Sequence, residues 1–123
     1  MKALIIEDDR DLASYLKVLL EEEGFEVQTS HSGGEGLSLA REEVPDLLLL
    51  DINLPTVDGF EICRLLKGNE ETAGITIIAV SSREKFSDYV DMADAGAAAF
   101  VGKPVDKGEL LNKVRKHLNL SQQ

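Results

Sequence analysis

Five short strand-like segments alternate with longer stretches of helical periodicity, and this alternation constrains the fold more than any other feature of the sequence. The segments cover residues 3–6, 25–29, 47–50, 75–80 and 97–101, and all of them except 25–29 are mainly apolar. Continuous apolar runs of this length are typical of strands buried on both faces, and parallel strands need crossover helices between them. The sequence therefore predicts an α/β fold in which helices cover both faces of a five-stranded parallel sheet.

The stretches between the runs carry signals for helix starts and for inward helix faces. Ser32, Asp58 and Asp106 each precede a helical stretch and have a glutamate three residues later, which is the capping-box pattern. A cap explains Asp58 better than a role as a ligand does. Apolar residues at helical spacing predict the buried stripes, which we expect to include Tyr15, Leu16, Ala40, Val44, Leu65 and Leu66.

Length and charge narrow the class of protein. A chain of 123 residues predicts a single domain over 1–123, with a core over about 2–118 and a loose end at 119–123. The net charge of −10 argues against direct contact with nucleic acid or a membrane surface. Cys63 is the only cysteine, so it cannot form an intramolecular disulfide, and we expect it in or near the core. These features favour a cytoplasmic location.

Polar side chains follow four of the five predicted strands. Glu7 and Asp8 come after the first strand, Asp51 after the third, Ser81 after the fourth and Lys103 after the fifth. Ligands of open parallel sheets bind at the carboxyl ends of the strands. Each residue taken singly is also explained as a helix cap, a turn residue or a solvated charge. Their shared position predicts instead that they converge at one edge of the sheet.

Three converging carboxylates need a compensating cation. Two carboxylates 4 Å apart repel by about 4 kcal/mol at an effective dielectric near 20. Mg²⁺ prefers oxygen ligands, and its charge together with that of Lys103 would balance Glu7, Asp8 and Asp51. Phosphoryl transfer requires mainly positioning and charge neutralisation, and a carboxylate can be the nucleophile. A carboxylate nucleophile, a metal ion and Lys103 are therefore sufficient equipment for metal-dependent phosphoryl transfer to this cluster.

A set of motifs in this order and spacing resembles the receiver domains of bacterial two-component response regulators, including single-domain regulators of the chemotaxis type. The resemblance runs from about residue 2 to 118 and rests on Glu7 and Asp8, the run 51–59, Ser81, and Lys103 followed by Pro104. It implies a flavodoxin-like sheet with the strand order 2-1-3-4-5 and a cis bond before the proline. It also implies a signalling domain rather than an enzyme.

The resemblance assigns Asp51 as the phosphoacceptor and also assigns metal ligands. Asp8 and Asp51 would bind Mg²⁺, or Mn²⁺ as a substitute, directly. The backbone carbonyl of Asn53 would be a third ligand, and Glu7 would act through water.

The resemblance also assigns the switch. Lys103 would pair with a phosphoryl oxygen, Ser81 would donate its hydroxyl to another, and Phe100 would be the aromatic switch residue. Asn53 and Arg83 are our candidates for tuning the lifetime of the phosphorylated state. For Arg83, a solvated surface position is the alternative.

The implied partners are a histidine kinase or a histidine phosphotransfer protein as donor. An output protein or a C-terminal output domain would contact the face formed by the fourth helix, the fifth strand and the fifth helix. Dimerisation that depends on phosphorylation is a further alternative. The first alternative is a pseudo-receiver, an interaction module that is not phosphorylated. An aspartate-nucleophile phosphatase would place its nucleophile at Glu7, and a flavin binder would need a phosphate-cradling loop there, so both are disfavoured.

Other polar residues are interpreted as surface groups. His31 and His117 have no cysteine or carboxylate at a metal-ligand spacing. The acidic runs 21–23 and 70–71 are interpreted as solvated charges.

Overall fold

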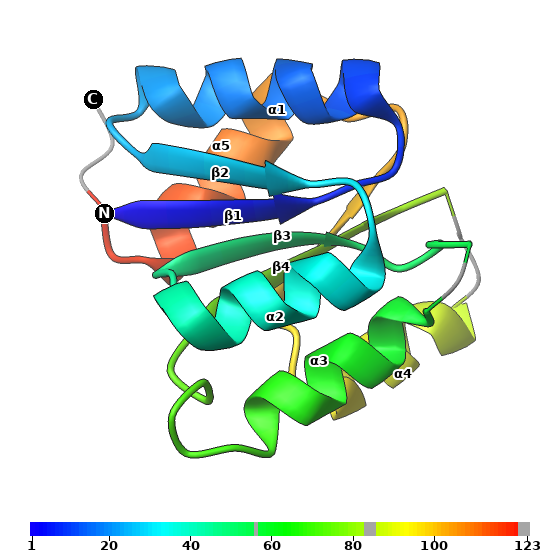
Figure 1. Cartoon of the computed structure of the whole chain (residues 1–123). Coiled ribbons are helices and arrows are strands. Elements are labelled where there is room, and N and C mark those ends of the chain that lie inside the picture. Colours follow the sequence, from blue (N-terminus) through cyan, green and yellow to red (C-terminus); the bar gives the residue numbers. More distant parts are fainter. Residues whose placement is uncertain (56, 83–85, 121–123) are drawn as a thin grey trace.

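The computed structural model describes residues 1–55, 57–82 and 86–120, with only the backbone described for 86–89. Strands and helices alternate along the chain, and the five strands form one parallel sheet in the order β2-β1-β3-β4-β5 (Figure 1). This confirms the predicted fold and strand order. The elements are β1 (Lys2–Ile6), α1 (Arg10–Glu22), β2 (Glu26–Ser30), α2 (Gly33–Glu43), β3 (Leu47–Asp51), α3 (Gly59–Lys67), β4 (Thr76–Ser81), α4 (Phe86–Ala95), β5 (Ala99–Gly102) and α5 (Lys107–His117).

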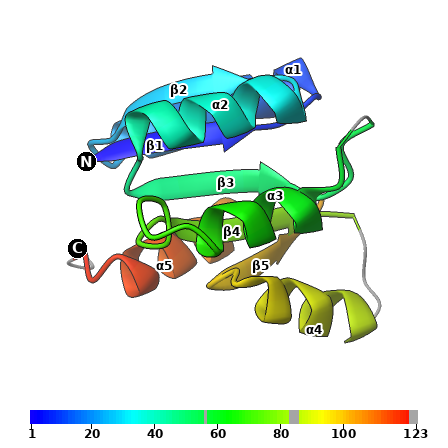
Figure 2. The ribbon, with the colours of Figure 1, turned by 60° about the horizontal axis from the view of Figure 1, so that its bottom comes forward.

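The central strand β3 divides the core between two helical layers. Leu47 and Leu49 pack with α1 and α5, whereas Leu48 and Leu50 pack with α2, α3 and α4. Figures 1 and 2 show the same division, with α1 and α5 on one face of the sheet and the other three helices on the opposite face. Both faces of β3 are therefore dry, which explains why its sequence is a continuous apolar run and does not alternate.

The strand registers align the carboxyl ends that carry the candidate residues. Ile6 pairs with Leu50, Asp51 with Val80, and Ser81 with Gly102. Residues one position beyond these pairs, including Glu7 and Lys103, therefore emerge at the same edge of the sheet.

Four of the helices that start at this edge have an N-cap residue whose side chain accepts hydrogen bonds from the first turn. The predicted caps are confirmed: Ser32 accepts from the N–H of Glu35, Asp58 from that of Phe60, and Asp106 from that of Glu109. Asp9, which we did not predict as a cap, accepts from the N–H groups of residues 11 and 12 at the start of α1. Each carboxylate or hydroxyl satisfies helix donors that would otherwise lack a partner.

Three predicted inward side chains face solvent. Tyr15 is 45% exposed and Leu65 is 39% exposed, because each precedes a fully buried leucine by one position, a rotation of about 100° on a helix. Val44 is 44% exposed because α2 has already ended, and Val44 is its left-handed C-cap with a φ of 43°. The stripes of α1, α2 and α3 are thus narrower than predicted.

The C-terminal segment is better anchored than predicted. The N–H of Leu120 donates to the carbonyl of Arg115 at 2.8 Å, and its half-buried side chain packs against the core shared by α1 and α5. Arg115 also holds Glu23 in a bidentate ion pair with a 3.1 Å bond from Nε to Oε2. The prediction that Glu23 is a solvated charge is therefore wrong. Residues 121–123 lie outside the described part of the chain.

No helix in the described part of the chain is long and apolar enough to span a membrane.

Candidate phosphoacceptor and metal site

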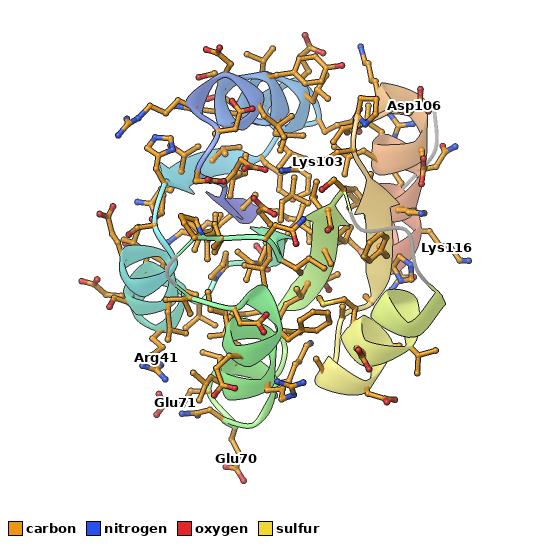
Figure 3. All side chains as sticks on the ribbon, turned by 90° about the vertical axis from the view of Figure 1, so that its right-hand side faces the viewer. Arg41, Glu70, Glu71, Lys103, Asp106 and Lys116 are labelled. Atoms are coloured by element: carbon orange, nitrogen blue, oxygen red, sulfur yellow. The ribbon has the colours of Figure 1, made fainter. Side chains whose placement is uncertain are left out.

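The Asp51 carboxylate lies at the end of the buried strand β3 and is only 2% exposed. The backbone N–H of Asn53 donates to its Oδ1 at 2.8 Å, and Lys103 Nζ donates to its Oδ2 at 3.3 Å. Figure 3 looks onto the carboxyl edge of the sheet and shows Lys103 near the middle of this edge. Both oxygens of Asp51 are thus held by donors from two different loops.

Lys103 joins two carboxylates that come from different strands. Its Nζ lies 3.0 Å from Glu7 Oε1, in addition to its bond with Asp51. Burial acts to lower the pKa of Lys103, but the two carboxylates outweigh it and raise the pKa above its ordinary value. The lysine therefore stays an ammonium ion in this site.

Three carboxylates meet beside this ammonium. Glu7, Asp8 and Asp51 each offer one oxygen, and these oxygens lie within 4.8 Å of one another. Burial, followed by the neighbouring Asp51, raises the pKa of Glu7 from 4.5 to about 7, against the opposing effects of the Asp9 N–H and Lys103. For Asp8, burial acts to raise the pKa, but hydrogen bonding with Glu7 and Asp51 outweighs it and lowers the pKa.

The acidic cluster has the donor set that a hard divalent cation requires. Its charge exceeds that of Lys103, which lies beside it, and all three offered atoms are carboxylate oxygens. Among the described side chains, Glu7 Oε1 is the buried oxygen without a well-directed hydrogen bond, although the Lys103 ammonium is close. The cluster, formed by Glu7, Asp8 and Asp51, therefore fits a metal ion.

Asn53 connects the loop after β3 to the end of β4. Its side-chain Nδ2 donates to Ser81 Oγ at 2.9 Å and to Ser82 Oγ at 3.2 Å. Ser81 is fully buried, and its backbone carbonyl accepts from the N–H of Lys103 at 2.9 Å. Ser81 is thus tied to both flanking loops, through its hydroxyl to the loop after β3 and through its backbone carbonyl to the loop after β5.

Gly59 lets helix α3 start directly against the loop that carries Asp51. A Cβ added at Gly59 would lie 2.9 Å from the Asp51 carbonyl oxygen and would overlap the backbone of Ile52. Separations this short are not tolerated between a real Cβ and backbone atoms, so glycine is the residue that fits there.

The β5 region carries the other predicted residues. The peptide bond between Lys103 and Pro104 is cis, as predicted. Phe100 is half-buried and packs against the core shared by α2, α3 and α4, and its backbone carbonyl accepts from Lys113 Nζ at 2.6 Å. Arg83, the candidate for lifetime tuning, lies outside the described residues.

Sequence reasoning missed one residue beside this site. His31 is half-buried, and its Nδ1 lies 3.1 Å from the backbone carbonyl oxygen of Glu7. Its interpretation as a surface group was wrong, because metal-ligand spacing along the sequence carries no information about contacts between neighbouring strands. The register of β1 with β2 could have indicated this contact, because Ser30 pairs with Ile6 and the next residue on each strand is His31 and Glu7.

The fold and the site define a doubly wound α/β protein with an acidic cluster at the carboxyl edge of its sheet. Residues 3–115 match the family model described as the response regulator receiver domain. The chain belongs to this family, and it is a receiver domain of the response regulators of two-component systems.

Some of the curated relatives that match the chain are about twice its length, and one is of nearly equal length. It is 37% identical over 114 residues to the DNA-binding dual master transcriptional regulator RpaA of Synechocystis. This match covers 93% of this chain and 47% of RpaA. It is 38% identical to response regulator ArlR of Staphylococcus saprophyticus, covering 95% of this chain and 52% of ArlR. It is 36% identical to protein PilH of Pseudomonas aeruginosa, covering 93% of this chain and 95% of PilH. The chain thus spans about half of the first two relatives and nearly all of the third.

Solved receiver domains share the fold over almost the full chain. The CheY-like receiver domain protein of Methanospirillum hungatei has a TM-score of 0.88 and 33% identity, covering 96% of this chain and 93% of its own. The BeF₃-activated N-terminal receiver domain of Klebsiella pneumoniae RstA has a TM-score of 0.87 and 28% identity. This match covers 96% of this chain and 98% of the RstA domain.

Proposed function

We propose that this chain accepts a phosphoryl group on Asp51 in a Mg²⁺-dependent reaction and thereby switches between two conformations. The observation that carries the proposal is the setting of Asp51. Its carboxylate is buried at the end of β3, both of its oxygens accept hydrogen bonds, and two further carboxylates lie beside it. A structural carboxylate in a dry core would not be surrounded by more negative charge, because such a cluster costs stability unless a cation is bound.

The proposed reaction is an in-line displacement at phosphorus. An Asp51 oxygen forms the new P–O bond, while the bond from phosphorus to the donor breaks and its electron pair leaves with the donor. The donor is a phosphohistidine, whose ring nitrogen is the leaving group, or a small acyl phosphate. Lys103 neutralises charge on the phosphoryl oxygens, and no separate general base is needed because Asp51 attacks as a carboxylate.

Asp8 and Asp51 would hold the Mg²⁺ ion, with the backbone carbonyl of Asn53 as a third ligand and Glu7 acting through water. Mn²⁺ is expected to substitute, because it also takes oxygen ligands. When bound, the ion supplies positive charge that offsets the repulsion between the carboxylates and an incoming phosphoryl group.

The switch is proposed to run through Ser81 and Phe100. A phosphoryl group on Asp51 gains a new hydrogen-bond donor if the Ser81 hydroxyl turns toward it, and such differential contacts shift a two-state equilibrium. Phe100 lies two residues before Gly102, the register partner of Ser81. Phe100 packs against the α4 side of the sheet, so movement of Ser81 would be transmitted to the face formed by α4, β5 and α5.

The proposed donor is a histidine kinase or a histidine phosphotransfer protein. The proposed reader of the α4–β5–α5 face is an output protein or an output domain.

The test is intact-mass spectrometry after incubation with acetyl phosphate, with and without Mg²⁺, on the wild type and on Asp51→Asn. We expect one phosphoryl adduct on the wild type, only with Mg²⁺, and none on the variant. A folded wild-type protein that binds Mg²⁺ but forms no adduct would contradict phosphorylation by this donor and would favour the pseudo-receiver.

A further inference from the structure

His31 lies in the turn between β2 and α2, beside the acidic cluster but outside it. Its imidazole Nδ1 lies 3.1 Å from the backbone carbonyl oxygen of Glu7, and the side chain is half-buried. A carbonyl oxygen can only accept a hydrogen bond, so the proton must reside on Nδ1 and the imidazole is the donor. This contact fixes both the tautomer and the ring orientation of His31.

The contact continues the pairing of β1 with β2 after the strands have ended. The ladder ends at Ile6 and Ser30, and one further backbone bond joins the N–H of Glu7 to the Ser30 carbonyl at 3.0 Å. The chain then turns into α2, with Ser32 as its N-cap. Among the described residues, the Glu7 carbonyl therefore accepts a hydrogen bond from the side chain of His31 and not from the backbone N–H of a further strand residue.

Holding the Glu7 carbonyl orients Asp8. The carbonyl of residue 7 and the N–H of residue 8 belong to one planar peptide unit, so fixing the oxygen fixes the direction in which the chain enters Asp8. On the other side, the Asp9 N–H donates to Glu7 Oε2 at 3.1 Å. The turn that carries the acidic pair is thus held by one bond to its backbone and one to its side chain.

This turn needs such support because of its charge. The oxygens of Glu7, Asp8 and Asp51 lie within 4.8 Å of one another, and like charges at this distance push the turn away from Asp51. The hydrogen bond from His31 to the Glu7 carbonyl resists this movement and so keeps the three carboxylates close together in the metal-free protein.

We propose that His31 is a positioning residue of the metal site, which orients Asp8 through the Glu7 carbonyl. This inference rests on the proposed Mg²⁺ site. Groups that orient metal ligands typically contribute about tenfold or more to affinity, and we expect about a tenfold loss of Mg²⁺ affinity when the donor is removed.

The sharpest test compares His31→Asn with His31→Leu. The Nδ2 of asparagine and the Nδ1 of histidine are both one bond from Cγ, so asparagine can donate from nearly the same place. Leucine has the same branching at Cγ but no donor. His117→Ala, at the other histidine in the chain, is the control for loss of an imidazole at the end of α5.

Two measurements decide the proposal. Mg²⁺ affinity by isothermal titration calorimetry should stay near wild type for His31→Asn and His117→Ala and fall about tenfold for His31→Leu. In the metal-free protein, the Asp8 amide resonance in ¹⁵N–¹H spectra should move in His31→Leu and stay in place in His31→Asn.

Equal Mg²⁺ affinity in the asparagine and leucine variants would overturn the inference. If the wild type bound no Mg²⁺, the proposed metal site would fail, and the metal-free Asp8 resonance would still decide whether His31 positions the acidic pair. In that case, an unchanged Asp8 resonance in a folded His31→Leu protein would overturn the inference that His31 orients Asp8.

Discussion

The side-chain amide of Asn53 donates to Ser81 Oγ at 2.9 Å, which links the loop after β3 to the end of β4. Because the backbone N–H of the same asparagine donates to Asp51 Oδ1 at 2.8 Å, one residue contacts both the proposed phosphoacceptor and the proposed switch hydroxyl. A change at the Asp51 carboxylate therefore has a direct structural route to Ser81.

We predict that Ser81→Ala separates phosphorylation from switching. The adduct on Asp51 should still form, because Asp51 and Lys103 are unchanged. The response of the Phe100 amide resonance to acetyl phosphate and Mg²⁺ should be lost, because the donor that responds to the phosphoryl group is gone. Ser81→Thr, which keeps the hydroxyl, should restore it. A full Phe100 response in Ser81→Ala would show that another group transmits the signal.

Removing the ammonium of Lys103 should affect both stability and phosphorylation. Lys103→Met leaves Glu7 and Asp51 buried without their cation, and we expect a loss of about 1–3 kcal/mol in urea unfolding and at least tenfold slower adduct formation. The matched control is Lys107→Met, because the ion pair of Lys107 with Glu22 is long, at 3.8 Å, and exposed. Its removal should cost less than about 1 kcal/mol and leave the rate unchanged. Equal effects in the two variants would contradict the role of Lys103.

Stability without metal should depend on pH through Glu7. Burial and the neighbouring Asp51 raise its pKa from 4.5 to about 7, so between these values the folded protein keeps a proton that the unfolded chain has released. The stabilising contribution of the Glu7 carboxyl should therefore be fully present below pH 4.5 and be lost, by about 3 kcal/mol, as the pH rises through 7.

Mg²⁺ should oppose this loss, because it favours the ionised cluster, and should raise the melting temperature more at pH 8 than at pH 5. Glu7→Gln should flatten the metal-free profile, whereas Glu26→Gln, at an exposed carboxylate, is the control. A metal-free wild type that becomes more stable from pH 5 to pH 8 would contradict the raised pKa.

Gly59 and Gly34 offer a matched pair of helix glycines. Gly59→Ala should cost about 1–3 kcal/mol and slow phosphorylation, because its Cβ must displace the backbone of the loop after Asp51. Gly34→Ala has no heavy atom within 4 Å of its Cβ and should stabilise α2 by about 0.5–1 kcal/mol. Thermal unfolding and the acetyl phosphate reaction measure both effects. A neutral Gly59→Ala would show that the loop adapts without loss.

The sheet and the cluster were predictable because both follow from local patterns. Each apolar run predicted a strand, and a parallel sheet brings the carboxyl ends of its strands to one edge. Glu7, Asp51 and Lys103, each at or just beyond the end of a strand, therefore meet as predicted.

The contacts that sequence reasoning missed depend on geometry between distant elements. Arg115 and Glu23 are 92 positions apart, and they meet only because α1 and α5 pack on the same face of the sheet. The contact of His31 with Glu7 depends on strand register, and the exposure of Val44 depends on where α2 ends. Neither hydrophobic periodicity nor motif spacing specifies these three features.

The most direct test of the account locates the phosphoryl group on the chain. Borohydride reduces an aspartyl phosphate to homoserine, so peptide sequencing by mass spectrometry after reaction with acetyl phosphate and Mg²⁺ reads out the modified position. We predict homoserine at position 51 and unmodified aspartate at positions 8 and 9. Homoserine at Asp8, or a phosphoryl adduct that leaves Asp51 unreduced, would contradict the central claim.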